Sequence, residues 1–260
     1  EKHHEKHSTE PSKTEHKLMN GVRWGLNNAR YLLSGYKLSS LTKQNGNENV
    51  HFSGFNGQAV SLTKLMKEKN QQLPQMISIV GKWYNSEWSD IDRDLKTQNK
   101  ATNRILNIID PKNTGEDVLV KFDNKGKLVS TLGLVDRDDP AFDKTGKNGS
   151  DEFGKGWLYS GFTPQMERKK GYYKQLVTAN ILEAKNRGEE KMYLYTEDHN
   201  VAMYERFGFG NQGHRTDNGV TENVMILDLT KFSQDDIKKF PLSAKPNSNE
   251  VDEATKSKDV

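Results

Sequence analysis

One stretch in the second half of the chain, residues 157–196, most strongly constrains the fold class. Two β-rich runs, Trp157–Thr163 and Met192–Thr196, predict strands. Between them, residues 171–187 predict a helix that ends at Gly188 and whose apolar stripe comprises Leu176, Ala179 and Leu182. A strand, a turn, a helix and a second strand in this order predict an α/β arrangement in which helices cover a sheet.

The segments on either side extend this arrangement. Residues 76–88 repeat apolar side chains at three- and four-residue steps and predict an amphipathic helix, followed by a second helix with apolar positions from Ile91 to Ile109. Two β-rich runs, 117–122 and 127–135, flank Asp123-Asn124-Lys125-Gly126 and predict a hairpin. The remaining predicted elements are a short helix over Asn200–Phe207 and a final strand over Val220–Leu229.

The two ends of the chain hold few apolar residues, so the main domain is expected at residues 76–232. Residues 1–17 predict a disordered polar leader, and residues 233–260 a polar C-terminal tail. Residues 18–75 alternate short apolar runs with glycines and predict an N-terminal extension or small subdomain, with a short helix over 60–73. Four histidines of the leader are candidate metal ligands, although a solvated spacer is the favoured interpretation: His3, His4, His7 and His16.

Composition excludes several classes of function. The chain has no cysteine, which excludes disulfides, thiolate metal sites, iron–sulfur clusters and cysteine nucleophiles. No apolar run approaches the roughly 20 residues that cross a bilayer, so no membrane span is expected. A net charge of only +3 argues against nucleic-acid binding. The chain begins with Glu1, so a processed or recombinant product is expected, and its composition suits an exported bacterial protein and, nearly as well, a cytoplasmic one.

The turn before the helix of residues 171–187 is a candidate anion site. Such a turn exposes several backbone N–H groups and the positive end of the helix dipole, which together can hold a pyrophosphate. Gly171 allows a ligand to approach the backbone closely, and Arg168, Lys169 and Lys170 add positive charge. Taken alone, the motif is more often an ordinary solvated basic turn.

Four segments in a fixed order resemble a bacterial subgroup of the GNAT N-acetyltransferase family. The family signature Arg-x-x-Gly-x-Gly/Ala is similar to Arg168–Tyr173 within WLYSGFTPQMERKKGYYKQL, and the closing Tyr-Glu-x-x-Gly-Phe ends KMYLYTEDHNVAMYERFGF. VGKWYNSEW resembles the subgroup's first helix, and VKFDNKGKLVSTLGLVDRDDP its hairpin. The resemblance covers residues 76–230 and implies a mixed, mostly antiparallel sheet flanked by helices, whose strands from Trp157 and Met192 separate beside the signature turn.

The resemblance also implies an activity, the direct attack of an amine on the thioester of acetyl-CoA, with acetyl-CoA as co-substrate and no metal. The amine would belong to a small molecule or a peptide. Tyr204 is implied to protonate the departing thiolate, while a tyrosine simply packed in the core is the alternative. Backbone N–H groups around Gly161, Phe162 and Thr163 would polarise the thioester carbonyl. The other implied cofactor-binding residues are Arg168, Lys169, Lys170, Gly171, Tyr172, Tyr173 and Asn200.

The general base and the acceptor are less sharply defined. Asp136, Asp138, Asp139 and Asp198 are candidate bases, and His199 is a further candidate for acid–base work. The loop over residues 136–155 is mildly acidic, which favours a cationic amine as acceptor.

Two positions depart from the family pattern. Tyr173 stands where the family has Gly or Ala, and the proline of the turn is displaced to Pro164. The ring of Tyr173 is expected either to lean away from the phosphate site or to cover part of it. Two further hypotheses therefore stay open, a catalytically decayed GNAT-fold binding module, exported and attached to a surface, and an acyltransferase with a different donor.

Overall fold

The fold is built on one mixed sheet. The computed structural model describes residues 50–90, 95–113, 115–136, 154–217 and 220–238. Seven strands pair in the order β1-β2-β3-β4-β5-β7-β6, and every neighbouring pair is antiparallel except β4 and β5. This confirms the predicted mixed, mostly antiparallel sheet. The strands are β1 Ala59–Ser61, β2 Asp117–Phe122, β3 Leu128–Val135, β4 Trp157–Phe162, β5 Lys191–Thr196, β6 Gly210–Asp217 and β7 Val220–Asp228.

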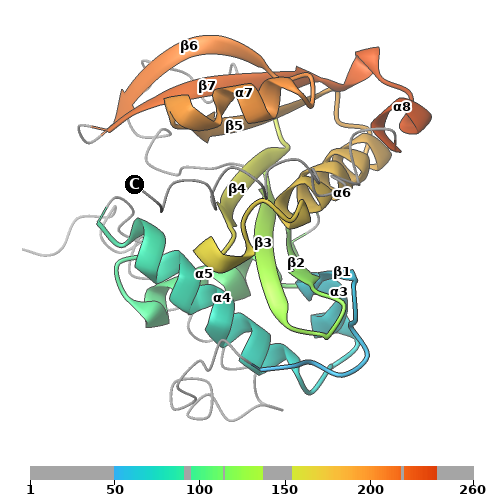
Figure 1. Ribbon diagram of the computed structural model, residues 1–260. Coiled ribbons are helices and arrows are strands. Elements are labelled where there is room, and N and C mark those ends of the chain that lie inside the picture. The colour runs from blue at the N-terminus through green and yellow to red at the C-terminus, as the bar shows by residue number, and fades with distance from the viewer. Residues whose placement is uncertain (1–49, 91–94, 114, 137–153, 218–219, 239–260) are drawn as a thin grey trace, which may run out of the picture.

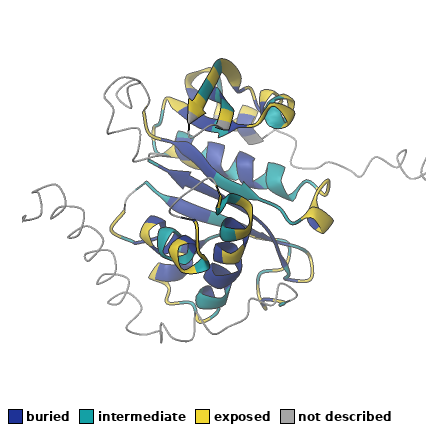
Figure 2. Ribbon diagram, turned by 90° about the vertical axis from the view of Figure 1, so that its left-hand side faces the viewer, coloured by how far each residue is buried: buried dark blue, intermediate teal, exposed yellow. Residues whose placement is uncertain are grey.

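Helices cover both faces of the sheet and bury its central strands, whereas the edge strand β6 is largely exposed (Figures 1 and 2). The buried residues fall into two clusters, because alternate residues of a strand face opposite sides. One cluster joins Trp157 and Tyr159 of β4 to α4 and α5, and the other joins Leu158 to α6 and α7. These helices are α4 Leu73–Trp88, α5 Gln98–Ile108, α6 Tyr172–Asn186 and α7 Asp198–Glu205.

Residues 50–75, the described part of the predicted N-terminal extension, pack into the first of these clusters. β1 pairs with β2, and Phe52 and Leu62 are buried together with α4. The predicted helix over 60–73 is shorter in the structure: Val60 lies in β1, and α3 spans Leu62–Lys67. It begins after Ser61, whose hydroxyl caps it by accepting from the Lys64 N–H. The short apolar run that begins at Val50 contributes one isolated bridge to the sheet, between His51 and Lys127.

Three other elements differ from the predictions. Strand β6 was not predicted, because its sequence GNQGHRTD lacks the alternating apolar residues of a strand with one buried face. α5 begins at Gln98 rather than near Ile91, since the Thr97 hydroxyl caps it there. The predicted C-terminal tail contributes α8, Gln234–Lys238, whose Ile237 is fully buried.

Strands β4 and β5 are in register at a single pair, Trp157 with Tyr193, near their starts. The Tyr193 N–H donates to the Gly156 carbonyl there at 3.1 Å, and no further residue of β4 is in register with β5. β4 therefore stays with the half of the sheet that carries α4, and β5 with the half that carries α7 (Figure 1). This is the separation of the two strands that the resemblance predicted.

Several predictions concern residues outside the described part of the chain. They are the leader with its histidines, the loop over 137–153 with Asp138 and Asp139, and the end of the C-terminal tail. In the part that is described, no helix has both the length and the apolar character that crossing a bilayer requires.

Candidate functional site

The turn between β4 and α6 carries the predicted anion site. It contains the short 3-10 helix η2, Gln165–Glu167, and reaches α6 through Gly171, which adopts a left-handed φ of 80°. A residue with a side chain is strained in that conformation, so glycine suits the position. No side chain hydrogen-bonds to the first N–H groups of α6 among the described residues. The free N–H groups and the positive end of the dipole of this 15-residue helix can therefore bind an anion at its start.

Glu167, a buried carboxylate that was not among the predicted site residues, pairs with two of the lysines around this turn. Lys127 donates to one of its oxygens at 3.0 Å, and Lys170 donates to the other at 2.8 Å. Burial acts to raise the pKa of Glu167, but the hydrogen bonds from Lys170 and Lys127 outweigh it and lower that pKa. Lys170 is therefore tied to the turn itself.

The two other basic residues of the signature are exposed. Arg168 donates from Nε to the Thr163 carbonyl at 3.1 Å, which links the turn to the end of β4. Lys169 has a left-handed φ of 64° and contributes to the sharp change of chain direction before α6. Their guanidinium and ammonium charges remain available near the start of α6.

β4 contains a bulge beside the turn. Thr131 of β3 faces Phe162 and Gly133 faces Tyr159, so Ser160 and Gly161 together stand opposite one residue of β3. Ser160 has a left-handed φ of 45°, which is uncommon for a residue with a side chain. A bulge leaves one residue of the strand outside the regular hydrogen-bond ladder, so its backbone groups are available to a ligand.

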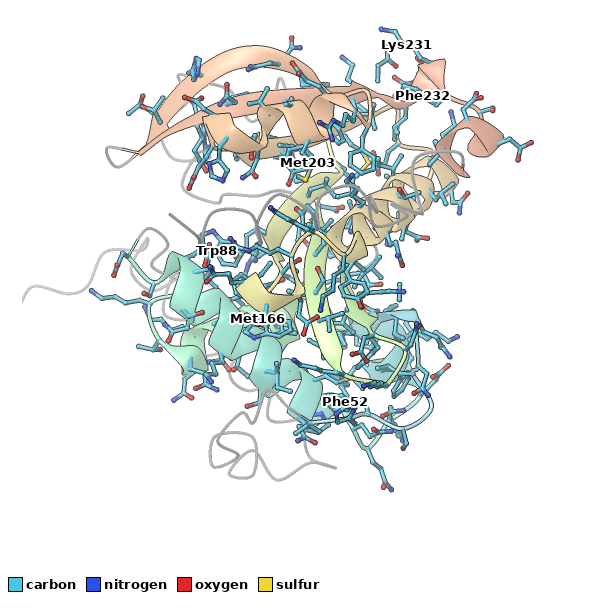
Figure 3. The ribbon with its side chains drawn as sticks, in the orientation of Figure 1. Phe52, Trp88, Met166, Met203, Lys231 and Phe232 are labelled. Carbon is cyan, nitrogen blue, oxygen red and sulfur yellow. The ribbon has the colours of Figure 1, made fainter. Side chains whose placement is uncertain are left out.

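The three predicted residues at the end of β4 point in different directions. The Phe162 ring lies on the α4 side, 5.4 Å from Trp83 and 6.3 Å from Trp88, which Figure 3 shows at the end of α4. The Ser130 hydroxyl donates to the Phe162 carbonyl at 3.0 Å and lies 2.8 Å from the Thr163 hydroxyl. Gly161 faces α6.

Tyr173 fills the space that a side chain at Gly161 would occupy. A Cβ atom built on Gly161 would lie 2.5 Å from Cε2 and 2.7 Å from Cζ of the Tyr173 ring. The ring therefore points toward β4 and the core rather than over the start of α6. The ring thus leans away from the start of α6 and lies against Gly161 at the bulge of β4.

Tyr204 of α7 meets Tyr173 through its hydroxyl. The two hydroxyl oxygens are 2.7 Å apart, and the ring centroids 6.5 Å apart in an edge-to-face arrangement. Burial raises the pKa of Tyr204 to about 12, while the hydrogen bond with Tyr173 acts in the opposite direction. The Tyr204 hydroxyl is thus bonded to a side chain next to β4 and not to the backbone.

The remaining candidates lie around the start of α7 and the end of β3. Asn200 is half-buried in the first turn of α7, and the exposed His199 lies 3.1 Å from Glu197. Asp198 accepts from the buried Asn223 at 2.7 Å, and this bond is the main cause that lowers the pKa of Asp198. Asp136, at the other end of the sheet, pairs with Lys155 at 3.1 Å.

The sequence predicted the residues of the turn but missed three that shape it. Ser160, Ser130 and Glu167 act through strand register, a neighbouring strand and a buried ion pair, which short motifs do not encode. Tyr172 is half-buried at the first position of α6, and burial raises its pKa. No group of three or more metal-ligating side chains gathers in the described part of the chain.

Comparison with known proteins gives one family. The model of the acetyltransferase (GNAT) family matches residues 73–209. No curated protein matches the chain.

Similar solved structures share a low identity with the chain. An aminoglycoside 6'-N-acetyltransferase complexed with coenzyme A has a TM-score of 0.46 and 14% identity, over 62% of this chain and 93% of that one. The histone acetyltransferase HPA2 and related acetyltransferase of Corynebacterium glutamicum has a TM-score of 0.45 and 24% identity, over 60% and 91%. A spermidine N-acetyltransferase chimera from Vibrio cholerae and hSSAT has a TM-score of 0.43 and 16% identity, over 60% and 90%.

Proposed function

Since the chain belongs to the acetyltransferase (GNAT) family, whose model matches more than half of its residues, we propose that it transfers an acetyl group from acetyl-CoA to an amine. The amine belongs to a small molecule or a peptide. One observation carries the proposal. One turn, with η2 in it, joins the bulged end of β4, where β4 has separated from β5, to the uncapped start of α6.

The pyrophosphate of CoA binds the backbone N–H groups at the start of α6, with Gly171 allowing close approach. Arg168 and Lys169 add positive charge, whereas Lys170 holds the turn in shape through Glu167. The pantetheine arm runs along the unpaired side of β4 from Thr163 toward Gly161, and Asn200 faces it from α7. Tyr172, at the first position of α6, contacts the CoA beside its pyrophosphate.

The acetyl carbonyl is polarised by backbone N–H groups at the bulge, around Gly161 to Thr163. The amine attacks the carbonyl carbon, the tetrahedral intermediate collapses, and the C–S bond breaks. Tyr204 donates its hydroxyl proton to the departing thiolate. A phenol with its ordinary pKa of about 10 is already protonated at neutral pH, so the proton is present when the thiolate departs.

The acceptor's ammonium group loses one proton before it attacks, and its nitrogen loses a second proton as the intermediate collapses to the amide; a carboxylate takes up these protons, directly or through water. Of the two described candidates, Asp198 suits this role better than Asp136. Asp198 lies at the start of the helix that carries Tyr204, at the end of the sheet where β4 and β5 have separated. Asp136 lies at the other end of the sheet, in an ion pair with Lys155.

The test is acetyl transfer itself. Purified protein is incubated with radiolabelled acetyl-CoA and a panel of polyamine, aminoglycoside and peptide amines, and the acetylated products are identified by mass spectrometry. We expect at least one amine to be acetylated by the wild type, and this activity to be lost with Tyr204→Phe.

The second candidate function is a GNAT-fold binding module without chemistry. Tyr173 in place of the family's Gly or Ala favours it, because that substitution alters the signature itself. Wild-type protein that acetylates no amine and whose melting temperature acetyl-CoA leaves unchanged supports the module instead of the enzyme.

A further inference from the structure

Two tyrosines from different helices meet beside the bulge of β4. Tyr173 belongs to the first turn of α6 and Tyr204 to the last turn of α7, and their hydroxyl oxygens are 2.7 Å apart. No other side chain in the described residues is hydrogen-bonded to either hydroxyl. The two phenols therefore form a closed pair, which we call the tyrosine pair.

The tyrosine pair fits its surroundings closely. The Tyr173 ring occupies the place where any side chain at Gly161 would stand, and Tyr204 packs edge-to-face on Phe209, 5.8 Å between centroids. A glycine on the strand and a tyrosine on the helix are thus complementary in volume. Tyr173, which replaces Gly or Ala of the family signature, therefore has a defined place in the packing and is not by itself a sign that the site has been lost.

We propose that Tyr173 is a positioning residue for Tyr204, its hydroxyl donating a hydrogen bond to the Tyr204 oxygen so that the Tyr204 proton is directed at the sulfur of CoA. The inference rests on the proposed function. A pair of hydroxyls has one proton between its oxygens, so the second proton is free for another acceptor. In this arrangement the free proton is that of Tyr204.

The proton balance of the step is simple. When the C–S bond breaks, the S–H bond of CoA forms and the O–H bond of Tyr204 breaks. Tyr204 becomes a tyrosinate, whose charge the Tyr173 hydroxyl stabilises by its hydrogen bond. Tyr204 regains a proton from solvent after CoA departs.

The electrostatics of the pair agree with this direction. Burial, with the neighbouring Tyr204, raises the pKa of Tyr173 well above its ordinary value, so Tyr173 keeps its proton. The hydrogen bond from Tyr173 acts to lower the pKa of Tyr204. In the proposed arrangement Tyr204 accepts this hydrogen bond, so the bond stabilises the tyrosinate that Tyr204 becomes.

The experiment compares Tyr173→Phe, Tyr204→Phe and the double variant with the wild type, measuring kcat and the KM for acetyl-CoA. Phe at position 173 keeps the ring against Gly161 and removes only the hydroxyl. We expect kcat to fall about tenfold with KM unchanged, as for one lost hydrogen bond. The double variant should be no slower than Tyr204→Phe, because Tyr173 acts through Tyr204.

Tyr193→Phe is the matched control, since Tyr193 is a buried tyrosine whose hydroxyl also makes a hydrogen bond, accepting from the Gly154 N–H, but it lies beside the start of β4, away from the bulge. Its kcat should equal that of the wild type. A Tyr173→Phe variant with wild-type kcat, or a double variant whose loss is the product of the two single losses, overturns the inference and leaves acetyl transfer intact.

A crystal structure of the wild type with CoA tests the geometry without reference to activity. We expect the tyrosine pair to persist, with Tyr204 the nearer hydroxyl to the sulfur. A Tyr173 ring that swings away from Tyr204 when CoA binds overturns the inference. Wild-type protein that binds CoA but transfers no acetyl group overturns the proposed function as well.

Discussion

At the scale of single residues, the candidate site depends on the match in volume between Gly161 and Tyr173. Glycine at position 161 is required by contact and not by backbone conformation, because a Cβ there would overlap the Tyr173 ring. The contact joins a strand and a helix, so neither residue signals it in the sequence. Sequence comparison alone therefore presents Tyr173 as a defect of the signature, whereas the structure shows its partner.

Gly161→Ala should destabilise the fold by about 1–3 kcal/mol, since overpacking forces the Tyr173 ring or β4 to move. Tyr173→Ala makes room for the new methyl group, so the double variant should lose less stability than the sum of the two single losses. Urea unfolding measures all three. Gly210→Ala is the control, because a Cβ there comes no closer than 3.4 Å to a flexible glutamine side chain. A Gly161→Ala variant as stable as this control would contradict the packing argument.

Tyr204→Phe tests the general acid at the same scale. The substitution keeps the ring packed on Phe209 and removes only the proton donor. Turnover should fall roughly 10²–10⁴-fold, the usual contribution of general acid–base catalysis. Calorimetry should show an acetyl-CoA affinity close to that of the wild type. A large loss of affinity with little change in turnover would make Tyr204 a structural residue.

At the scale of elements, the turn from β4 to α6 combines an open helix start with a buried ion pair. Gly171→Val should raise the Kd for CoA about tenfold or more, because a β-branched residue is strained at a left-handed φ and moves the N–H groups of α6. Lys169→Ala removes one exposed charge and should change the Kd less than about threefold. Equal effects of the two variants in isothermal titration would refute binding through the backbone.

The buried carboxylate of the same turn predicts a pH dependence. Because the folded pKa of Glu167 is lowered, its stabilising effect is present above its unfolded pKa, about 4.3, and is lost as pH falls through the folded pKa. Glu167→Gln should therefore lower the melting temperature at neutral pH, and the difference from the wild type should shrink in acid. A difference that stays constant from pH 7 to about pH 3 would show that Lys127 and Lys170 do not depend on the charge of Glu167.

At the scale of the whole molecule, the sequence predicted elements that have a strong periodicity of their own. The helix over 76–88, the hairpin around Asp123 and the strand–turn–helix from Trp157 were read correctly, because each carries its signal locally. The sequence did not predict β6, because an exposed edge strand needs no apolar face. Its position depends on its pairing with β7. The bulge at Ser160 and the ion pair of Glu167 also arise only from contacts between elements.

The two halves of the sheet, β1–β4 and β5–β7, are in register at one residue pair, so a ligand between β4 and β5 should stabilise the whole domain. Acetyl-CoA at 100 times its Kd should add about 2.7 kcal/mol to the free energy of unfolding. For a domain of this size the melting temperature should rise roughly 5–10 °C. Hydrogen exchange of the β4 amides next to the bulge should slow at the same time.

The control ligand is pantetheine, which lacks the pyrophosphate and should shift the melting temperature much less than CoA. Gly171→Val should lose most of the shift produced by CoA, because the start of α6 is the anchoring point. If saturating acetyl-CoA changes neither the melting temperature nor the exchange of the β4 amides, the space between the two strands is not a cofactor channel. The decayed binding module would then be the better account of the fold, and the tyrosine pair would serve only to pack α6 against α7.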